Sequence, residues 1–103
     1  MITVMIHATV KKEKLDEFLE LAALMTRETR GKREGCISYS FNQNTEKPTD
    51  FVLYEQWESQ DHLDKHIQEL CTLLGPPMPG YPLPKKLLDM YEKAEPVFYN
   101  PIA

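Results

Sequence analysis

The sequence predicts a single α+β domain in which four strands form an antiparallel sheet with helices on one face. Three observations predict this fold: a strand-like alternation at the N-terminus, a helical period directly after it, and a β-β-α-β pattern in the rest of the chain. The resulting order, β-α-β-β-α-β, is the ferredoxin-like, split βαβ arrangement. A length of 103 residues is enough for one domain spanning 1–103 and too short for two.

The first half of the pattern lies in the N-terminal 31 residues. Residues 2–10 alternate between an apolar and a semi-polar face, as a strand with two usable faces does. Over 13–30 apolar residues recur every three or four positions, with acidic residues early and arginines late, which is typical of an amphipathic helix. Gly31 is a natural stop signal for that helix.

Two further alternating segments, 37–42 and 51–58, flank turn-forming residues at 47–50. We expect them to pair as an antiparallel hairpin. Ser59 is a favourable N-cap for a helix that runs to about Leu70.

The C-terminal third is less regular. A loop over 75–84 holds five of the eight prolines, which indicates non-helical backbone there. Apolar residues four positions apart then predict a helix over roughly 84–93, and residues 95–100 predict the last strand. Pro96 marks that strand as an edge or terminal one.

Composition narrows the class of protein. The formal net charge is −4 and the 12 Lys and Arg residues are scattered, which argues against nucleic acid as a partner. No apolar run approaches the length of a membrane span, and the N-terminus lacks the features of a signal peptide, so we expect a cytoplasmic protein with no membrane partner. Cys36 and Cys71 are far apart and are expected to be reduced thiols.

The face of the sheet away from the helices predicts a homodimer. It carries apolar residues such as Val52 and Tyr54, opposite Tyr39 and Phe41 on the other face. Two copies packed sheet against sheet would bury this face.

The segment 55–66 has the highest density of residues that could do chemistry. Trp57 ends a strand and His66 lies on the next helix, so the two could share a pocket. His66 is a candidate general base or hydrogen-bond donor, because its ordinary pKa is near neutrality; the alternative is a histidine packed at a helix edge. Trp57 is a candidate pocket wall with an indole N–H that orients a ligand, or else a core anchor.

Other polar residues are weaker candidates. His7 lies mid-strand on the semi-polar face, and Asn42 has a similar position on the second strand. Glu55 lies among apolar residues, so it should be partly buried and need a partner, either as a raised-pKa acid or in a structural hydrogen bond. With Tyr39 these form the predicted substrate-binding set.

Metal and cofactor chemistry has little support. His62 and His66 are four apart, a spacing used by metal ligands, but no third ligand is evident and His62 is expected to face solvent. No activated nucleophile, Gly-rich phosphate loop or dinucleotide fingerprint is present. We therefore expect no metal, nucleotide or flavin cofactor.

Three parts of the chain resemble a known family, the antibiotic biosynthesis monooxygenase domain, and within it the small bacterial quinol monooxygenases. The resemblance covers residues 1 to about 70, and its most specific part is the glutamate-x-tryptophan and later histidine. The three parts are the start of the chain (Ile2-Thr3-Val4 followed by Lys11–Phe18), Glu34–Tyr39, and Glu55–Ser59 with Leu63 and His66 beyond.

The resemblance implies a dimeric α+β barrel that oxygenates a quinol or polycyclic phenol with O₂, without metal or flavin. It implies that His66 is the base or anion stabiliser and Trp57 the pocket wall, with His7 and Asn42 as polar contacts. The 75–84 loop could then act as a lid.

One departure from the family keeps other functions open. Family members often carry a proline-histidine pair shortly after the helix histidine, where this chain has Glu69-Leu70-Cys71. One alternative is a non-catalytic dimeric sensor or ligand carrier that retains the pocket. Another is a haem-degrading relative with His66 as the axial ligand and Trp57 distorting the porphyrin, although such relatives usually have an asparagine where His7 stands.

Overall fold

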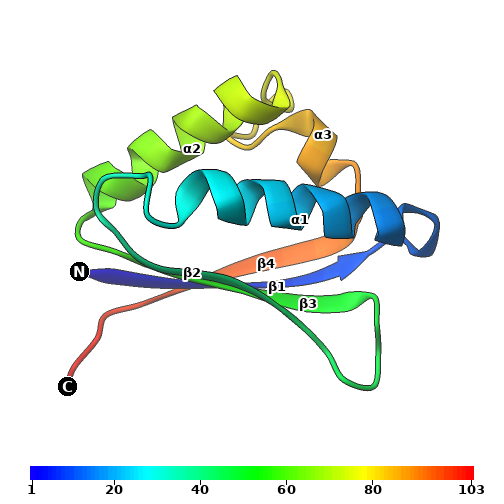
Figure 1. Cartoon of the computed structure of the whole chain (residues 1–103), viewed down its shortest axis with the longest axis horizontal. Helices are drawn as coiled ribbons and strands as arrows, with labels where there is room; N and C mark the ends of the chain where they lie inside the picture. Colours follow the sequence, from blue (N-terminus) through cyan, green and yellow to red (C-terminus); the bar gives the residue numbers. More distant parts are fainter.

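The computed structural model describes residues 1–103 and shows a four-stranded sheet with all helices on one side (Figure 1). All three strand pairs are antiparallel, in the order β2-β3-β1-β4, which confirms the predicted ferredoxin-like α+β fold. None of the helices is long and apolar enough to cross a membrane. The elements are β1 (Ile2–Val10), a 3-10 turn (Lys12–Lys14), α1 (Leu15–Thr29), β2 (Cys36–Gln43), β3 (Asp50–Trp57), α2 (Gln60–Leu74), α3 (Lys85–Leu88) and β4 (Tyr91–Tyr99).

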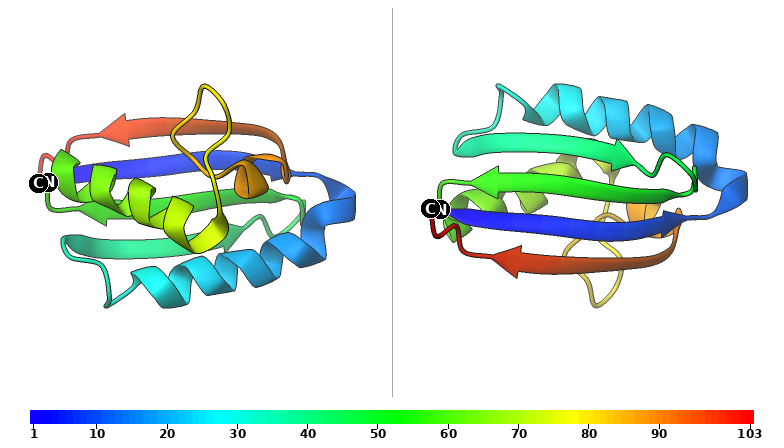
Figure 2. Two further views of the ribbon diagram at one scale, coloured as in Figure 1. Left: turned by 90° about the horizontal axis from the view of Figure 1, so that it is seen from above. Right: turned by 90° about the horizontal axis from the view of Figure 1, so that it is seen from below.

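The alternation in the strands separates a covered face of the sheet from an open face. On β1, Val4 and Ala8 point towards the helices and are buried, whereas His7 on the other face is exposed. Seen from below, the sheet lies in front and the helices behind it (Figure 2, right). We call the two sides the covered face and the open face.

The helices bury their apolar stripes against the covered face. Phe18 and Met25 of α1 are almost completely buried in the core. At the start of α2 the Ser59 side chain accepts a hydrogen bond from the backbone N–H of His62, as expected for an N-cap. His66 lies on the buried stripe of α2, so the packing of this helix decides where the imidazole points.

The C-terminal third differs from the sequence prediction. Helix α2 continues to Leu74, four residues beyond Leu70, because Leu74 falls on the same buried stripe. The helix predicted over 84–93 is wrong beyond its first turn: α3 has only four residues, and Tyr91 already belongs to β4. The reason is that backbone pairing with β1 continues past a register shift to Val10, and apolar spacing alone did not reveal this pairing.

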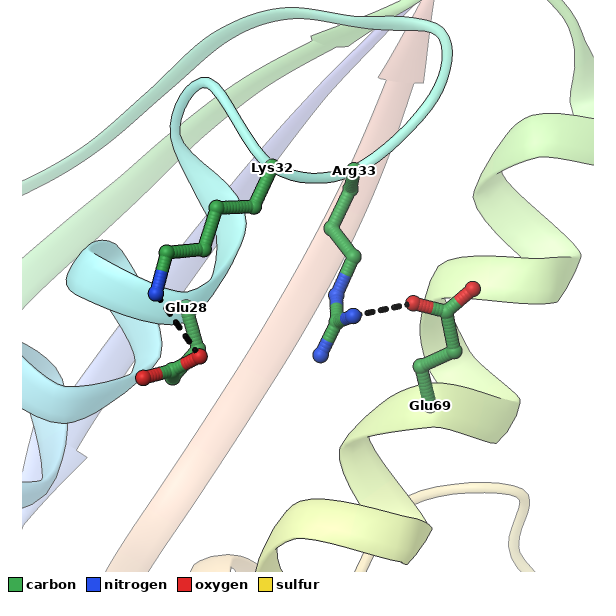
Figure 3. A network of polar contacts seen from close by, with 4 residues as sticks. All are labelled: Glu28, Lys32, Arg33 and Glu69. Carbon is green, nitrogen blue, oxygen red and sulfur yellow. Dashed lines mark hydrogen bonds and ion pairs between the residues drawn. The ribbon is translucent and has the colours of Figure 1, made fainter.

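The turn between α1 and β2 is tied to α2 (Figure 3). Arg33 Nη1 lies 2.7 Å from Glu69 Oε2, and the neighbouring Lys32 pairs with Glu28 within the first helix region.

The His62 ring packs against the same turn. A Cβ on Gly35 would lie 2.3 Å from this ring, so only glycine fits there. The His62 Nδ1 is 2.7 Å from Ser59 Oγ. The expectation that His62 faces solvent is therefore wrong: it is half-buried and helps to hold the start of α2.

Candidate active site

A cavity of about 340 Å³ lies between the covered face of the sheet and the helices. This volume is near the lower end of the range for small-molecule sites. Sixteen of the twenty lining residues are hydrophobic, so the cavity suits a largely apolar ligand. Its only acid and imidazole are Glu55 and His66.

The floor of the cavity follows from the register of the strands. Directly paired residues share a face, so each row across the sheet presents four side chains to the cavity. The first row joins Tyr39, Glu55, Val4 and Phe98, and the second joins Phe41, Leu53, Ile6 and Pro96. In these two rows the polar side chains, Tyr39 and Glu55, come from β2 and β3, and the residues from β1 and β4 are apolar.

Three side chains meet at the polar end. Glu55 is 3% exposed, and its Oε1 accepts a 3.1 Å hydrogen bond from Trp57 Nε1. The same oxygen lies 3.7 Å from His66 Nε2. The His66 ring stacks on the Trp57 indole at 4.5 Å between centroids and an angle of 32°. The indole thus positions both the carboxyl group and the imidazole.

Burial shifts the titration of this pair in opposite directions. Desolvation raises the pKa of Glu55 from 4.5 to about 7, partly offset by the Trp57 hydrogen bond. Desolvation, with a smaller effect of the Arg33 charge, lowers the pKa of His66 from 6.5 to about 4. The imidazole is therefore neutral at pH 7, while the carboxyl group is poised to gain or lose a proton there.

Two buried polar atoms of lining residues, His66 Nδ1 and Tyr39 Oη, have no hydrogen bond of good geometry, and the Thr29 side chain lies next to the Tyr39 hydroxyl. The rings of Tyr39 and His66 meet edge to face at 5.5 Å between centroids, so the two side chains lie at the same end of the cavity. Burial, followed by the nearby Glu55 charge, raises the pKa of Tyr39, so its hydroxyl stays protonated and can donate. Because leaving a buried polar atom unpaired costs on the order of 1–3 kcal/mol, a ligand group that reaches His66 Nδ1 or the Tyr39 hydroxyl would gain from pairing with it.

The predicted site residues fall into two groups. Tyr39, Glu55 and His66 line the cavity together. Trp57 is completely buried behind Glu55 and His66 and is not part of the lining, so the structure places it as a core anchor and not as a pocket wall.

His7 and Asn42 lie elsewhere. They are exposed on the open face, where they border a separate depression near Asp50 and Lys93. Asn42 donates to backbone and side-chain oxygens of its own hairpin. A ligand in the cavity is separated from both residues by the sheet.

Beyond residue 70, sequence reasoning placed only the 75–84 loop at the site, as a lid, and named no individual lining residue. Tyr81, Pro82 and Leu83 come from the loop, and Tyr91 and Phe98 come from β4. Nothing in their spacing indicated a site, because they reach the cavity only through the tertiary path of the loop and the last strand. Burial raises the pKa of Tyr91, so its hydroxyl also stays protonated.

The chain is similar in sequence and fold to several known proteins. A family model described as antibiotic biosynthesis monooxygenase matches residues 1–69. The uncharacterized protein sll1783 of Synechocystis sp. is 36% identical over 59 residues, which are 57% of this chain and 40% of that protein. The chain thus spans about two fifths of the length of this relative.

Solved structures share the fold over nearly the whole chain. A conserved protein from Methanosarcina mazei Go1 is 31% identical with a TM-score of 0.72, over 95% of this chain and 89% of that one. A Nitrosomonas europaea protein assigned to the antibiotic biosynthesis monooxygenases is 24% identical with a TM-score of 0.77, over 100% of both chains. The second likeness, at this identity, concerns the fold alone.

Proposed function

Because the chain belongs to the antibiotic biosynthesis monooxygenase family, we propose that it is a monooxygenase that oxidises a quinol-like or polycyclic phenolic molecule with O₂. The observation that carries the proposal is the apolar cavity closed at one end by Glu55, His66 and Tyr39. Such a cavity can hold an aromatic ring system and present its hydroxyl group to a proton acceptor.

The proposed reaction draws all its electrons from the substrate. A ring-activated CH₂ group becomes a carbonyl, one oxygen atom of O₂ entering the product and the other leaving as water. A quinol likewise becomes a hydroxyquinone and water. In both cases the protein has three tasks, which are to deprotonate the substrate, to hold the resulting anion and to exclude water.

The proton path we propose runs through His66 to Glu55. With Glu55 ionised, the neutral imidazole holds its proton on Nε2, towards the carboxylate, and Nδ1 is free to accept. Nδ1 takes the substrate proton as Nε2 delivers its own to Glu55. The 3.7 Å separation would have to shorten for this transfer, as such contacts do when a substrate binds.

The same transfer leaves hydrogen-bond donors next to the substrate anion. After the tautomer changes, His66 presents an N–H group at Nδ1. The Tyr39 hydroxyl is the second donor, and its raised pKa keeps it protonated. Donors already in place in an enclosed apolar site stabilise a phenolate more than water-exposed donors would.

The open face supports a further part of the proposal, a homodimer. Met5, Val52, Tyr54 and Val97 are only partly buried on this face of the single chain. Packing two open faces together would remove these side chains from water and give the α+β barrel implied by the family resemblance.

The test is O₂ uptake by chelator-treated protein with reduced menadiol and with anthrone, corrected for autoxidation. We expect uptake above background, and one labelled oxygen atom in the product when ¹⁸O₂ is supplied. Uptake that yields only hydrogen peroxide would contradict oxygenation. Tight binding of these compounds without any uptake would instead identify a non-catalytic carrier.

A further inference from the structure

The cavity has one buried end and one open end. At the buried end Tyr39, Glu55 and His66 are each at most 3% exposed. At the other end two large apolar lining residues are exposed, Phe98 by 57% and Tyr81 by 61%. Side chains that line a cavity and are also exposed lie where the cavity meets solvent, and there they can contact a ligand that extends out of the buried end.

These two residues line the same cavity from different elements. Phe98 lies on β4, the edge strand of the sheet, and its side chain is on the covered face because it pairs with Val4. Tyr81 lies in the 75–84 loop, which passes over β4 on the helix side (Figure 2, left). The bond from Cys71 Sγ to the Pro82 carbonyl joins the loop to α2, and the backbone bond from Met78 N–H to the Leu83 carbonyl closes the loop on itself.

The register gives the length of the apolar floor. Glu55 on β3 and Phe98 on β4 belong to one row, with Val4 of β1 between them. Two strand spacings of about 4.8 Å separate β3 from β4, so roughly 10 Å of floor joins the carboxyl group to the rim. That length accommodates a fused aromatic system of two or three rings, whereas a single ring would not reach Phe98.

We infer that Phe98 and Tyr81 form the entrance of the cavity and bind the apolar end of an elongated fused-ring ligand, whose hydroxyl-bearing end lies against Tyr39, Glu55 and His66. This inference rests on the proposed function, because it assigns the substrate's orientation in the same site. Both entrance residues lie outside the region matched by the family model. This chain's own C-terminal third therefore sets the number of rings that it prefers.

The test compares ligands of different length in the absence of oxygen. Binding of phenol and of 2-hydroxyanthracene is measured by calorimetry for the wild type, Phe98→Ala and Tyr81→Ala. Both variants should raise the Kd for 2-hydroxyanthracene by about tenfold, the loss expected when part of its apolar surface stays in water. The Kd for phenol should change by less than about twofold.

Two further variants separate this role from general effects. Tyr99→Ala removes a similarly exposed aromatic side chain next to Phe98 but on the open face. This variant should leave the Kd for both ligands unchanged. Tyr39→Phe removes the hydroxyl at the buried end and should raise the Kd for both ligands by a similar factor.

The inference is overturned if the entrance variants bind 2-hydroxyanthracene as tightly as the wild type does, or if they lose as much affinity for phenol as for 2-hydroxyanthracene. It is also overturned if the wild type does not bind 2-hydroxyanthracene. The proposed function is judged separately by O₂ uptake. The expected binding pattern without uptake would refute the monooxygenase and leave the entrance intact. Uptake with unchanged binding in both entrance variants would refute the entrance alone.

Discussion

Each face of the sheet has a histidine beside it, but the two histidines lie in different environments. His66, above the covered face, is 3% exposed and lies beside a buried carboxyl group. His7, on the open face, is exposed beside polar and charged residues. The imidazole is the same in both places, so the difference in chemistry comes from desolvation and from the partner that the fold supplies.

The contrast also explains why the covered face can support a reaction. A carboxyl group in water is ionised at neutral pH and a poor proton acceptor, whereas the pKa of Glu55 is raised to about 7 by burial. Trp57 keeps this carboxyl group hydrogen-bonded without filling the cavity. The open face has no comparable enclosure, and it is the surface on which we propose that a second copy of the chain packs.

The largest expected effect separates the two faces by activity. Glu55→Gln keeps the size of the side chain but removes the proton acceptor, and kcat/KM for menadiol should fall by about 10²- to 10⁴-fold. His7→Asn, on the open face, should change kcat/KM by less than about twofold. Steady-state O₂ uptake by both folded variants provides the measurement. An equal loss of kcat/KM in the two variants would contradict a reaction at the covered face.

The next prediction concerns stability against pH. The raised pKa of Glu55 stabilises the fold below pH 4.5, and this contribution is lost as pH rises to about 7. The lowered pKa of His66 gives stability that is present above pH 6.5 and is lost as pH falls to about 4. Each shift corresponds to about 3 kcal/mol, so the two slopes nearly cancel between pH 4.5 and 6.5.

Single variants should expose each slope. In Glu55→Gln the free energy of unfolding should rise by about 3 kcal/mol from pH 4 to 6.5, because His66 is then the one member of the pair that still titrates. In His66→Asn it should fall by a similar amount from pH 4.5 to 7. Urea unfolding at stepped pH values measures both, and profiles parallel to that of the wild type would show that this pair is not shifted.

A smaller effect is expected on the open face. Met5→Glu places a charge in the proposed interface and should weaken the homodimer by about 10- to 100-fold without changing the fold. Leu19→Glu introduces the same charge at an exposed position of α1 and should have no effect on the mass in solution. Analytical ultracentrifugation checks both variants; a wild type that sediments as a monomer would end the dimer proposal.

The smallest expected effect concerns the positioning of Glu55. The Trp57 N–H lowers the pKa of this carboxyl group, so Trp57→Phe should raise it further. The rise in kcat/KM with pH, centred near pH 7 in the wild type, should shift upward by about one unit or less. A pH profile of O₂ uptake measures the shift, with His7→Asn as the unshifted control.

The first three strands and the first helix could be predicted because their signals are local. Alternation along β1 and the helical period of α1 follow from which side chains must leave water, and the structure has both within about two residues of the prediction. Burial of Glu55 could also be predicted from its apolar neighbours, and the structure confirms it.

The site needed the tertiary structure. The segment 55–66 drew attention to Trp57 and His66 together, but only packing shows that the indole lies behind the site while His66 lines it. His7 and Asn42 were grouped with them because the sequence shows that residues are polar, and not which side of the sheet a ligand occupies.

Local periodicity was enough to predict the α+β class, the antiparallel sheet, the covered and open faces and a carboxyl group beneath apolar neighbours. Tertiary structure alone decided the length of α2, the early start of β4 and the path of the 75–84 loop. It also decided which groups share a cavity. These features depend on contacts between residues far apart in the chain, and such contacts leave no period in the sequence.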